Sequence, residues 1–371
     1  MRVDKSKLQK KTLEELCSKG SSNIVISKTN IGIGDYPLYG ASGFIGNVDF
    51  YHNDAQYLGI VKDGSGVGRV EKYPAFSSLV GTMQYIYPKS EVDIDYLKYF
   101  LQFLDLAKYV QGAAIPHIYF RHYKDEKAYI PPFEIQKFIA AELDAIQAMI
   151  DGYREQLADL DALAQSIFLD TFGDPISNPK GWETKPLSSD CMIIRGPFGG
   201  SLKKECFVDN GYAVYEQQNA IYNRFNFRYF IDNLKFEELK RFQVKPNDII
   251  MSCAGTMGKI AIIPPHAQKG IINQALMLIR ANDNLNVRYL YFLLKSNLFQ
   301  TNITEGAKGT AMKNIAAVGS IKQQKIPLPP LELQQQFASQ VEAIEKQKDL
   351  LRQQIADAET LMAERMQYYF S

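Results

Sequence analysis

Cysteine and histidine are scarce in this sequence, with four of each among 371 residues. No two cysteines are spaced as C-x-x-C, and His117 and His122 are five residues apart, a spacing that does not place both on one face of a helix. In a chain without a recognisable export signal, cysteines are expected to stay reduced. The scarcity argues against a disulfide-stapled fold and against a metal site, and we predict neither.

Long apolar runs and an excess of one charge are also missing. No stretch approaches the roughly 18 apolar residues of a membrane span, and the N-terminal segment is polar. Lysine and arginine number 42 and aspartate and glutamate 41, which leaves a net charge of +1. We therefore expect a soluble, cytoplasmic protein without membrane contact, in which any binding to nucleic acid comes from local basic patches.

An internal repeat is the main positive feature. The segment IPPFEIQKFIAAELDAI at residues 130–146 returns as LPPLELQQQFASQVEAI at residues 328–344, and the match continues without a gap to residues 173 and 371. A length of 371 residues allows two domains of ordinary size. Because repeats fix architecture before local motifs do, we predict two copies of one element.

Both copies have the apolar spacing of a coiled-coil seam. In the first, apolar residues recur from Ile139 to Ile167 in steps of four and three. In the second, Lys348 and Arg365 interrupt the same pattern. The Pro-Pro pairs suit the first turn of a helix, where backbone N–H groups lack partners. Four polar positions are expected to be exposed, facing either a partner or solvent: Gln136, Arg154, Gln334 and Arg352.

The segments before each helix repeat more weakly. YLGIVKDGSGVGRV (57–70) aligns with DIIMSCAGTMGKIAII (248–263), which pairs Gly68 with Gly258 and Arg69 with Lys259. Both glycine-rich stretches lead into strand-like sequence and not into a helix, so we interpret them as hairpin turns and not as phosphate-binding loops.

The predicted fold class is therefore α+β, with two mixed α/β domains separated by two long antiparallel coiled-coil helices in a pseudo-twofold arrangement. The predicted order is a first domain at residues 1–129, a helix at 130–173, a second domain at 174–325 and a second helix at 326–371. A helix from Ile135 to Thr171 would be roughly 55 Å long. Such a rod with two unlike ends suits a two-part, asymmetric DNA site.

These motifs resemble those of the specificity subunit of a type I restriction-modification enzyme. IPLPPLELQQQF and IPPFEIQKFIAAELDAI fit the family's proline-rich helix starts, and IIRGPFGGSLKK, KPNDIIMSCAGTMGKIAII and INQALMLIR are similar to recognition-domain signatures. The resemblance covers nearly the whole chain and implies that the two mixed α/β domains are target-recognition domains. It implies a non-catalytic subunit without a cofactor of its own, which binds double-stranded DNA, two methyltransferase subunits and motor-nuclease subunits.

Patches that mix basic and aromatic residues are the candidate DNA contacts. Lysine and arginine neutralise phosphates, while asparagine, glutamine and arginine read base edges. The alternative for each residue is an ordinary solvated strand or turn. The predicted DNA-binding residues are Lys62, Ser65, Arg69, His117, Tyr119, Arg121, His122, Arg195, Lys203, Lys204, Gln217, Gln218, Asn219, Thr256, Lys259, Lys308, Thr310, Lys313 and Asn314.

Two other classes of function compete with this prediction. A stand-alone methyltransferase is disfavoured because IPPF at residues 130–133 lacks the first Asp, Asn or Ser that would accept a hydrogen bond from the target amine. No convincing nuclease carboxylate-lysine cluster is present either. A coiled-coil adaptor that binds no DNA would explain the helices but not two domains with basic-aromatic loops.

Overall fold

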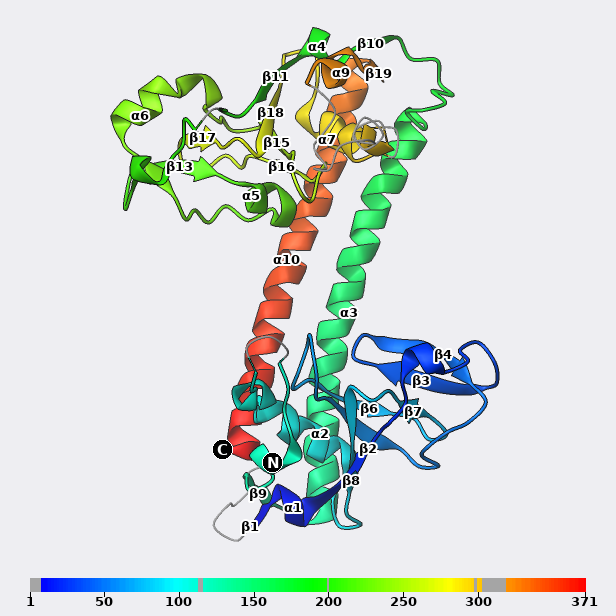
Figure 1. Ribbon diagram of the computed structural model, residues 1–371. Coiled ribbons are helices and arrows are strands. Elements are labelled where there is room, and N and C mark those ends of the chain that lie inside the picture. The colour runs from blue at the N-terminus through cyan, green and yellow to red at the C-terminus, as the bar shows by residue number, and fades with distance from the viewer. Residues whose placement is uncertain (1–7, 113–115, 199, 297–298, 302–317) are drawn as a thin grey trace. The chain divides into compact units, whose positions relative to one another are not determined.

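The computed structural model describes residues 8–112, 116–198, 200–296, 299–301 and 318–371 (Figure 1). The chain forms two compact units: unit 1 comprises Met1–Glu155 and Leu351–Ser371, and unit 2 comprises Gln156–Leu350. Both are mixtures of helices and strands, as predicted. Because the unit boundaries fall inside the two long helices, α3 (Phe133–Phe172) and α10 (Leu331–Phe370), each unit contains part of both.

Unit 1 is built around a four-stranded antiparallel sheet in the order β2-β8-β5-β6. A second sheet has the order β4-β3-β7, and β1 pairs with β9. The elements before α3 are β1 (Gln9–Thr12), α1 (Leu13–Leu16), β2 (Cys17–Ser21), β3 (Tyr36–Gly40), β4 (Gly43–Val48), β5 (Tyr57–Val61), β6 (Val70–Tyr73), β7 (Ser78–Leu79), β8 (Met83–Pro88), α2 (Ile94–Phe103) and β9 (Lys127–Ile130).

Unit 2 repeats this plan, with a four-stranded antiparallel sheet in the order β11-β18-β15-β16 and a pair of β10 and β19. Its second sheet differs, with the order β12-β14-β13-β17. The elements are β10 (Thr184–Pro186), α4 (Leu187–Asp190), β11 (Cys191–Arg195), β12 (Phe207–Val208), β13 (Tyr212–Tyr215), α5 (Gln217–Tyr222), β14 (Phe230–Ile231), α6 (Asn233–Glu238), β15 (Ile249–Ser252), β16 (Ile260–Ile262), β17 (Gly270–Ile272), β18 (Leu276–Ala281), α7 (Val287–Lys295), α9 (Val318–Gln323) and β19 (Lys325–Pro327).

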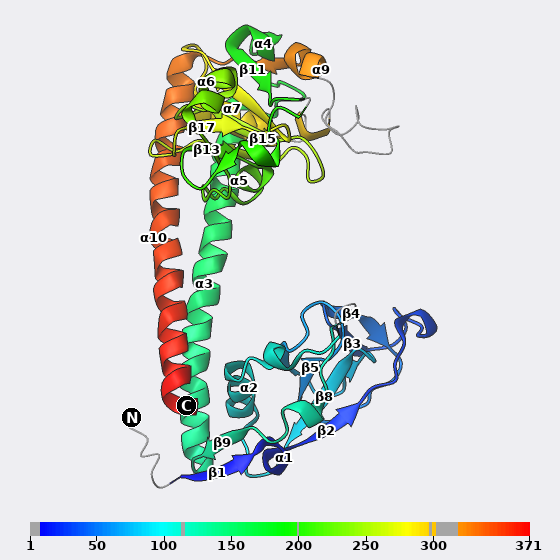
Figure 2. The same cartoon turned by 60° about the vertical axis from the view of Figure 1, so that its left-hand side comes forward.

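In each unit one short helix lies between the four-stranded sheet and the long helices. In unit 1, α2 packs with the sheet on one side and with α3 and α10 on the other (Figure 2). In unit 2, α7 occupies the equivalent place. The last aromatic residue of a long helix closes each core, with Phe370 edge-on to Tyr96 at 5.3 Å and Phe172 edge-on to Tyr289 at 4.7 Å between ring centroids.

The long helices run antiparallel within each unit. In unit 1, Arg154 bonds Glu359 at 2.8 Å and Arg365 bonds Glu142 at 3.0 Å. In unit 2, Lys348 bonds Asp161 at 2.7 Å. The two cations that interrupt the apolar seam are therefore paired with carboxylates of the facing helix. Near the end of α3 the buried residue is one position later than predicted, because Phe168 is fully buried whereas Ile167 is only half-buried.

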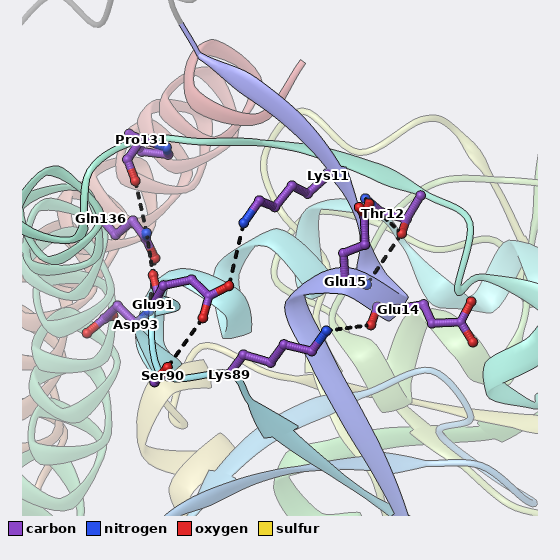
Figure 3. A network of polar contacts seen from close by, with 10 residues as sticks. All are labelled: Lys11, Thr12, Glu14, Glu15, Lys89, Ser90, Glu91, Asp93, Pro131 and Gln136. Atoms are coloured by element: carbon purple, nitrogen blue, oxygen red, sulfur yellow. Dashed lines mark hydrogen bonds and ion pairs between the residues drawn. The ribbon is translucent and has the colours of Figure 1, made fainter.

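The expected exposure of Gln136 and Gln334 is wrong, since both are at most 1% exposed. Each glutamine joins the start of its long helix to the short helix of its unit, and Figure 3 shows this for Gln136. The Oε1 of Gln136 accepts from the N–H of Asp93, the residue before α2, at 2.9 Å, and its Nε2 donates to the carbonyl of Pro131 at 2.9 Å. Gln334 repeats both bonds, from Asn286 and to Pro329, at 2.8 Å each.

The described residues hold no group of three or more His, Cys, Asp or Glu side chains arranged for a metal ion. No helix in the same residues has the length and continuous apolarity that a membrane crossing requires. The four cysteines are free thiols.

Candidate nucleic-acid interface

The two glycine-rich segments form equivalent hairpins, as the sequence predicts. In unit 1 the N–H of Gly68 donates to the carbonyl of Val61 at 2.9 Å across the base of the turn between β5 and β6. In unit 2 the N–H of Gly258 donates to the carbonyl of Ser252 at 2.9 Å across the base of the turn between β15 and β16. Both glycines have positive φ, at 90° and 75°, a conformation that favours glycine. We call residues 62–69 and 253–259 the first and second hairpin tips.

The first hairpin tip lies beside the segment of residues 116–122. The N–H of Gly64 donates to the carbonyl of Pro116, and the N–H of Ile118 donates to the carbonyl of Lys62, both at 2.9 Å. These bonds place two separate parts of the sequence on one surface. Six predicted DNA-binding residues meet there, and we call them the first cluster: Lys62, Ser65, His117, Tyr119, Arg121 and His122.

Tyr119 is the centre of the first cluster. Its ring is 42% exposed, and the Arg121 guanidinium lies 4.6 Å from the ring centroid. The rings of His117 and His122 approach it edge-on at 5.1 and 5.5 Å. Phe120, the residue between Tyr119 and Arg121 in the chain, is buried and packs in the core of unit 1. An exposed aromatic ring with a cation over its face can stack on a base while the cation meets a phosphate.

In unit 2 four predicted residues lie at the second hairpin tip, one from α5, one from β11 and two on the tip itself. Gln217, at the start of α5, donates from Nε2 to the carbonyl of Ala254. Arg195, at the end of β11, donates from Nε to the carbonyl of Gln274 at 3.3 Å. The next residue, Ala275, is bonded to the tip, because its carbonyl accepts from the N–H of Cys253 at 2.9 Å. Thr256 and Lys259 are exposed on the tip itself. We call Arg195, Gln217, Thr256 and Lys259 the second cluster.

The other predicted residues of unit 2 have different surroundings. Lys203 and Lys204 are exposed in the turn before β12, which belongs to the second sheet. Gln218 is half-buried and donates to Glu216 at 3.2 Å. Asn219 is 1% exposed, and its amide bonds the backbone at Glu216 and Arg224 at 2.7 and 2.6 Å. Lys308, Thr310, Lys313 and Asn314 lie outside the described residues.

Arg69 is exposed, but its guanidinium is engaged. Its Nη2 donates to the carbonyl of Ala41, in the turn between β3 and β4. Ser42 in that turn and Phe44, the second residue of β4, are also exposed, Phe44 to 62%. Together they line a hollow of about 350 Å³ with Arg69, Tyr39 and Tyr73. Phe44 is not among the residues predicted from the sequence, because no basic residue stands next to it in the chain.

Two other exposed aromatic residues were missed although their patches were recognised. Phe198 is 66% exposed, with the Arg195 guanidinium 5.6 Å from its ring centroid. Tyr222 is 67% exposed at the end of α5 and lines a hollow of about 400 Å³ with Lys259 and Lys295. The available signal was the alternation of aromatic and basic residues in RGPFGGSLKK and AIYNRFNFRYF.

Known proteins resemble this chain in sequence and in fold. The EcoBI type I restriction enzyme specificity subunit of Escherichia coli is 21% identical over a match that covers 67% of this chain and 57% of that protein's length. The MjaVIII type I restriction enzyme specificity subunit of Methanocaldococcus jannaschii is 23% identical, with 84% of this chain and 77% of that protein covered. A crystal structure of the type I restriction-modification system S subunit from M. genitalium has the same fold, with a TM-score of 0.61 at 14% identity, and covers 100% of this chain and 98% of that one.

The family model of the type I restriction modification DNA specificity domain matches residues 5–160 and residues 179–360. The two matched segments contain both hairpin tips and both clusters. Since the match extends over most of the chain, this protein belongs to the family of type I restriction modification DNA specificity domains.

Proposed function

We propose that the chain is a non-catalytic specificity subunit that recognises a bipartite, asymmetric DNA target, with residues 1–129 reading one half and residues 174–325 the other. One observation carries the proposal: both units use the same hairpin frame but surround its tip with different side chains. The first tip adjoins a tyrosine flanked by histidines and arginine, whereas the second adjoins arginine, glutamine and threonine. Equal frames with unlike side chains suit two half-sites of unlike sequence.

Roles within the interface follow from the chemistry of each group. Lys62, Arg121 and Lys259, together with Lys203 and Lys204, have the positive charge that phosphate contacts require. Gln218 and Thr256 have groups that can hydrogen-bond base edges. Asn219 shapes the turn after α5 because its amide is already bonded to the backbone. Lys308, Thr310, Lys313 and Asn314 remain predicted contacts.

The proposal assigns catalysis to partner subunits. Methylating an adenine amine requires the base to leave the stack and enter an enclosed pocket, at a cost of a few kcal/mol. We therefore expect two methyltransferase subunits to flip and methylate the base, motor-nuclease subunits to perform ATP-dependent cleavage, and this chain to bind no cofactor. Because its DNA would be the DNA of the cell, the protein would act in the cytoplasm.

Reconstitution with the methyltransferase subunits tests the proposal. We expect the complex to methylate adenines only within one two-part sequence, read out by methylation-sensitive sequencing of treated genomic DNA. The isolated chain should neither bind S-adenosylmethionine in calorimetry nor methylate DNA. A complex that binds all duplexes equally would support a coiled-coil adaptor instead, and methylation by the chain alone would overturn the assignment of catalysis to partners.

A pair of variants separates the two kinds of DNA contact. Lys204→Ala should weaken binding to target and scrambled duplexes alike. It should also reduce the slope of log affinity against log salt by about 1, as the loss of one phosphate contact does. Gln218→Ala should leave the salt slope unchanged and cost roughly 1–3 kcal/mol on the target alone. Equal losses on both duplexes for Gln218→Ala would rule out its role as a base reader.

A further inference from the structure

In each unit a single side chain ties the hairpin tip to the element that covers one face of the sheet. In unit 1, Arg69 on the first tip donates to the carbonyl of Ala41, in the turn between β3 and β4. In unit 2 the donor and acceptor exchange places, because Gln217 on α5 donates to the carbonyl of Ala254 on the second tip. Each bond therefore joins a hairpin tip to the element that covers the sheet beside it. That covering element is the turn between β3 and β4 in unit 1 and the helix α5 in unit 2.

Each covering element is packed against its hairpin through buried apolar residues. Leu38 of β3 is buried in one cluster with Tyr57 and Val61 of β5. Ala220 of α5 is buried in one cluster with Ile250 of β15 and Ala261 of β16. In each unit one side-chain hydrogen bond then joins the hairpin tip to the covering element, from Arg69 in unit 1 and from Gln217 in unit 2.

The path of the Arg69 side chain depends on a glycine. A Cβ placed on Gly66 would lie 2.7 Å from Nη2 and 3.3 Å from Cζ of Arg69. The guanidinium therefore passes over the bare Cα of Gly66 to reach Ala41. Gly64 has nearly the same backbone conformation, with φ of 88° against 83°, but a Cβ there would meet no atom within 4 Å. The two glycines differ in whether they make room for Arg69.

We infer that Arg69 and Gln217 are positioning residues, which hold two DNA-reading loops of each unit at a fixed separation, in place of the direct contacts with DNA that the sequence suggests. Base reading then belongs to the exposed neighbours of each tie: Ser42 and Phe44 in unit 1, and Gln218 and Thr256 in unit 2. This inference rests on the proposed function, and it adds the turn between β3 and β4 to the surface that reads the first half-site.

The physical effect of such a tie is preorganisation. Loops that are ordered before binding lose less conformational entropy when they bind, and the gain applies only where geometry matters. Phosphate contacts tolerate movement, whereas base contacts do not. Loss of a tie should therefore lower affinity for the target while affinity for scrambled DNA and the salt slope stay the same.

The test compares Gly66→Ala with Gly64→Ala in the complex with methyltransferase subunits. Both substitutions place a Cβ on a residue with a similar positive φ, but only the Cβ at position 66 would overlap the Arg69 guanidinium. We expect Gly66→Ala and Arg69→Ala to lower the ratio of target to scrambled affinity about tenfold, the scale of one lost hydrogen bond. The loss should appear only with duplexes in which the first half-site is changed. Gly64→Ala, which leaves the bond from Arg69 to Ala41 in place, should leave amide exchange at residues 40–44 unchanged. Gln217→Ala should cause the same loss for the second half-site.

Hydrogen exchange in the free protein supplies the second readout. Without DNA, Gly66→Ala and Arg69→Ala should speed amide exchange at residues 40–44, and Gln217→Ala should speed it at residues 254–257. Unchanged exchange together with a smaller salt slope for Arg69→Ala would overturn the inference and make Arg69 a phosphate contact. Faster exchange in a protein whose unmodified complex prefers no sequence would refute the proposed function and leave the ties in place. Arg69→Ala keeps the test decisive if Gly66→Ala does not fold.

Discussion

Gln136 and Gln334 are the residues that join the two kinds of element in each unit. Each has a buried amide whose oxygen accepts from the backbone N–H of the residue before a short helix and whose nitrogen donates to a carbonyl of the Pro-Pro segment. Gln136 makes a third bond, to the carbonyl of Glu91 at 3.0 Å. Buried amides of this kind are stabilising only when every partner is present, because an unpaired buried group costs free energy.

We predict that Gln136→Leu lowers the free energy of unfolding of unit 1, and Gln334→Leu that of unit 2, by roughly 1–3 kcal/mol each. Leucine has a similar volume, so the loss would come from the unpaired backbone groups and not from a cavity. Urea denaturation followed by circular dichroism measures the change. Gln335→Leu is the control, since that side chain is next to Gln334 on α10 and is exposed. An equal loss of stability in Gln335→Leu would mean that burial of the amide is not the cause.

The cysteines differ in their surroundings and give a second prediction at this scale. Burial raises the pKa of the Cys17 and Cys191 thiols to about 12 and that of Cys253 to about 11. Cys206 is half-buried. Because the thiolate is the reactive form, native protein at pH 8 should react with one equivalent of a thiol reagent, at Cys206, and with four after denaturation.

The same shifts predict how stability depends on alkaline pH. A thiol whose pKa is raised by folding contributes stability that is present below its unfolded pKa, about 8.5, and is lost as pH rises toward the folded value. The urea concentration at the midpoint of denaturation should therefore decrease as the pH is raised beyond about 9. Cys17→Ala should make this decrease smaller. More than one reactive thiol in native protein at pH 8 would contradict the burial of these three cysteines.

At the scale of elements, the sequence predicts the repeated helices and hairpins but not the contacts that single side chains make between them. The alignment of Gly68 with Gly258 identifies two equivalent hairpins, because the positive φ at the base of each turn favours glycine. The exposure of Gln136 and Gln334 was predicted wrongly because polarity, taken alone, indicates solvent. Their burial depends on the loop carbonyls and N–H groups around them, which only the folded chain brings together. The tie from Arg69 to Ala41 is invisible in the sequence for the same reason.

The seam of the long helices shows a polar interruption that the structure explains. Lys348 is 7% exposed and bonds Asp161 and Glu345, both at 2.7 Å. Burial alone would lower the pKa of Lys348, but the hydrogen bonds to the two carboxylates outweigh it and raise the pKa. Asp161 is largely exposed, so solvent screens the pair and its net contribution to stability is small.

We predict that Lys348→Leu leaves the free energy of unfolding unchanged or raises it by about 1 kcal/mol, because a leucine continues the seam between Ile344 and Leu351. Lys348→Ala should lower the free energy of unfolding, since it removes both the charge and the packed stem of the side chain. Thermal denaturation of both variants measures the difference. Lys346→Leu, at an exposed position of the same helix, is the control; a Lys348→Leu variant clearly less stable than Lys346→Leu would show that the seam needs the cation.

At the scale of the whole molecule, each unit consists of one domain, the start of the long helix that follows it and the end of the other long helix. The proposed function assigns a half-site to each unit, and α3 is one continuous helix whose residues belong to both. If the helices set the separation of the half-sites, the length of unread DNA between them should depend on the number of residues at the unit boundary. The recognised bases should not depend on it.

A matched insertion tests this dependence. Four residues added after Glu155 in α3 and four before Leu351 in α10 lengthen both helices by about 6 Å and add about one turn. The insertions leave the pair of Arg154 and Glu359 within unit 1 and the pair of Lys348 and Asp161 within unit 2. Because B-DNA rises about 3.4 Å per base pair, we expect the gap between the half-sites to widen by one or two base pairs while both halves stay the same. Methylation-sensitive sequencing with the reconstituted complex reads the gap directly.

An insertion in α3 alone should instead destabilise the protein, because it shifts α3 by one turn against α10. An unchanged gap in a folded, active double-insertion variant would mean that something other than the long helices sets the distance between the two halves of the target.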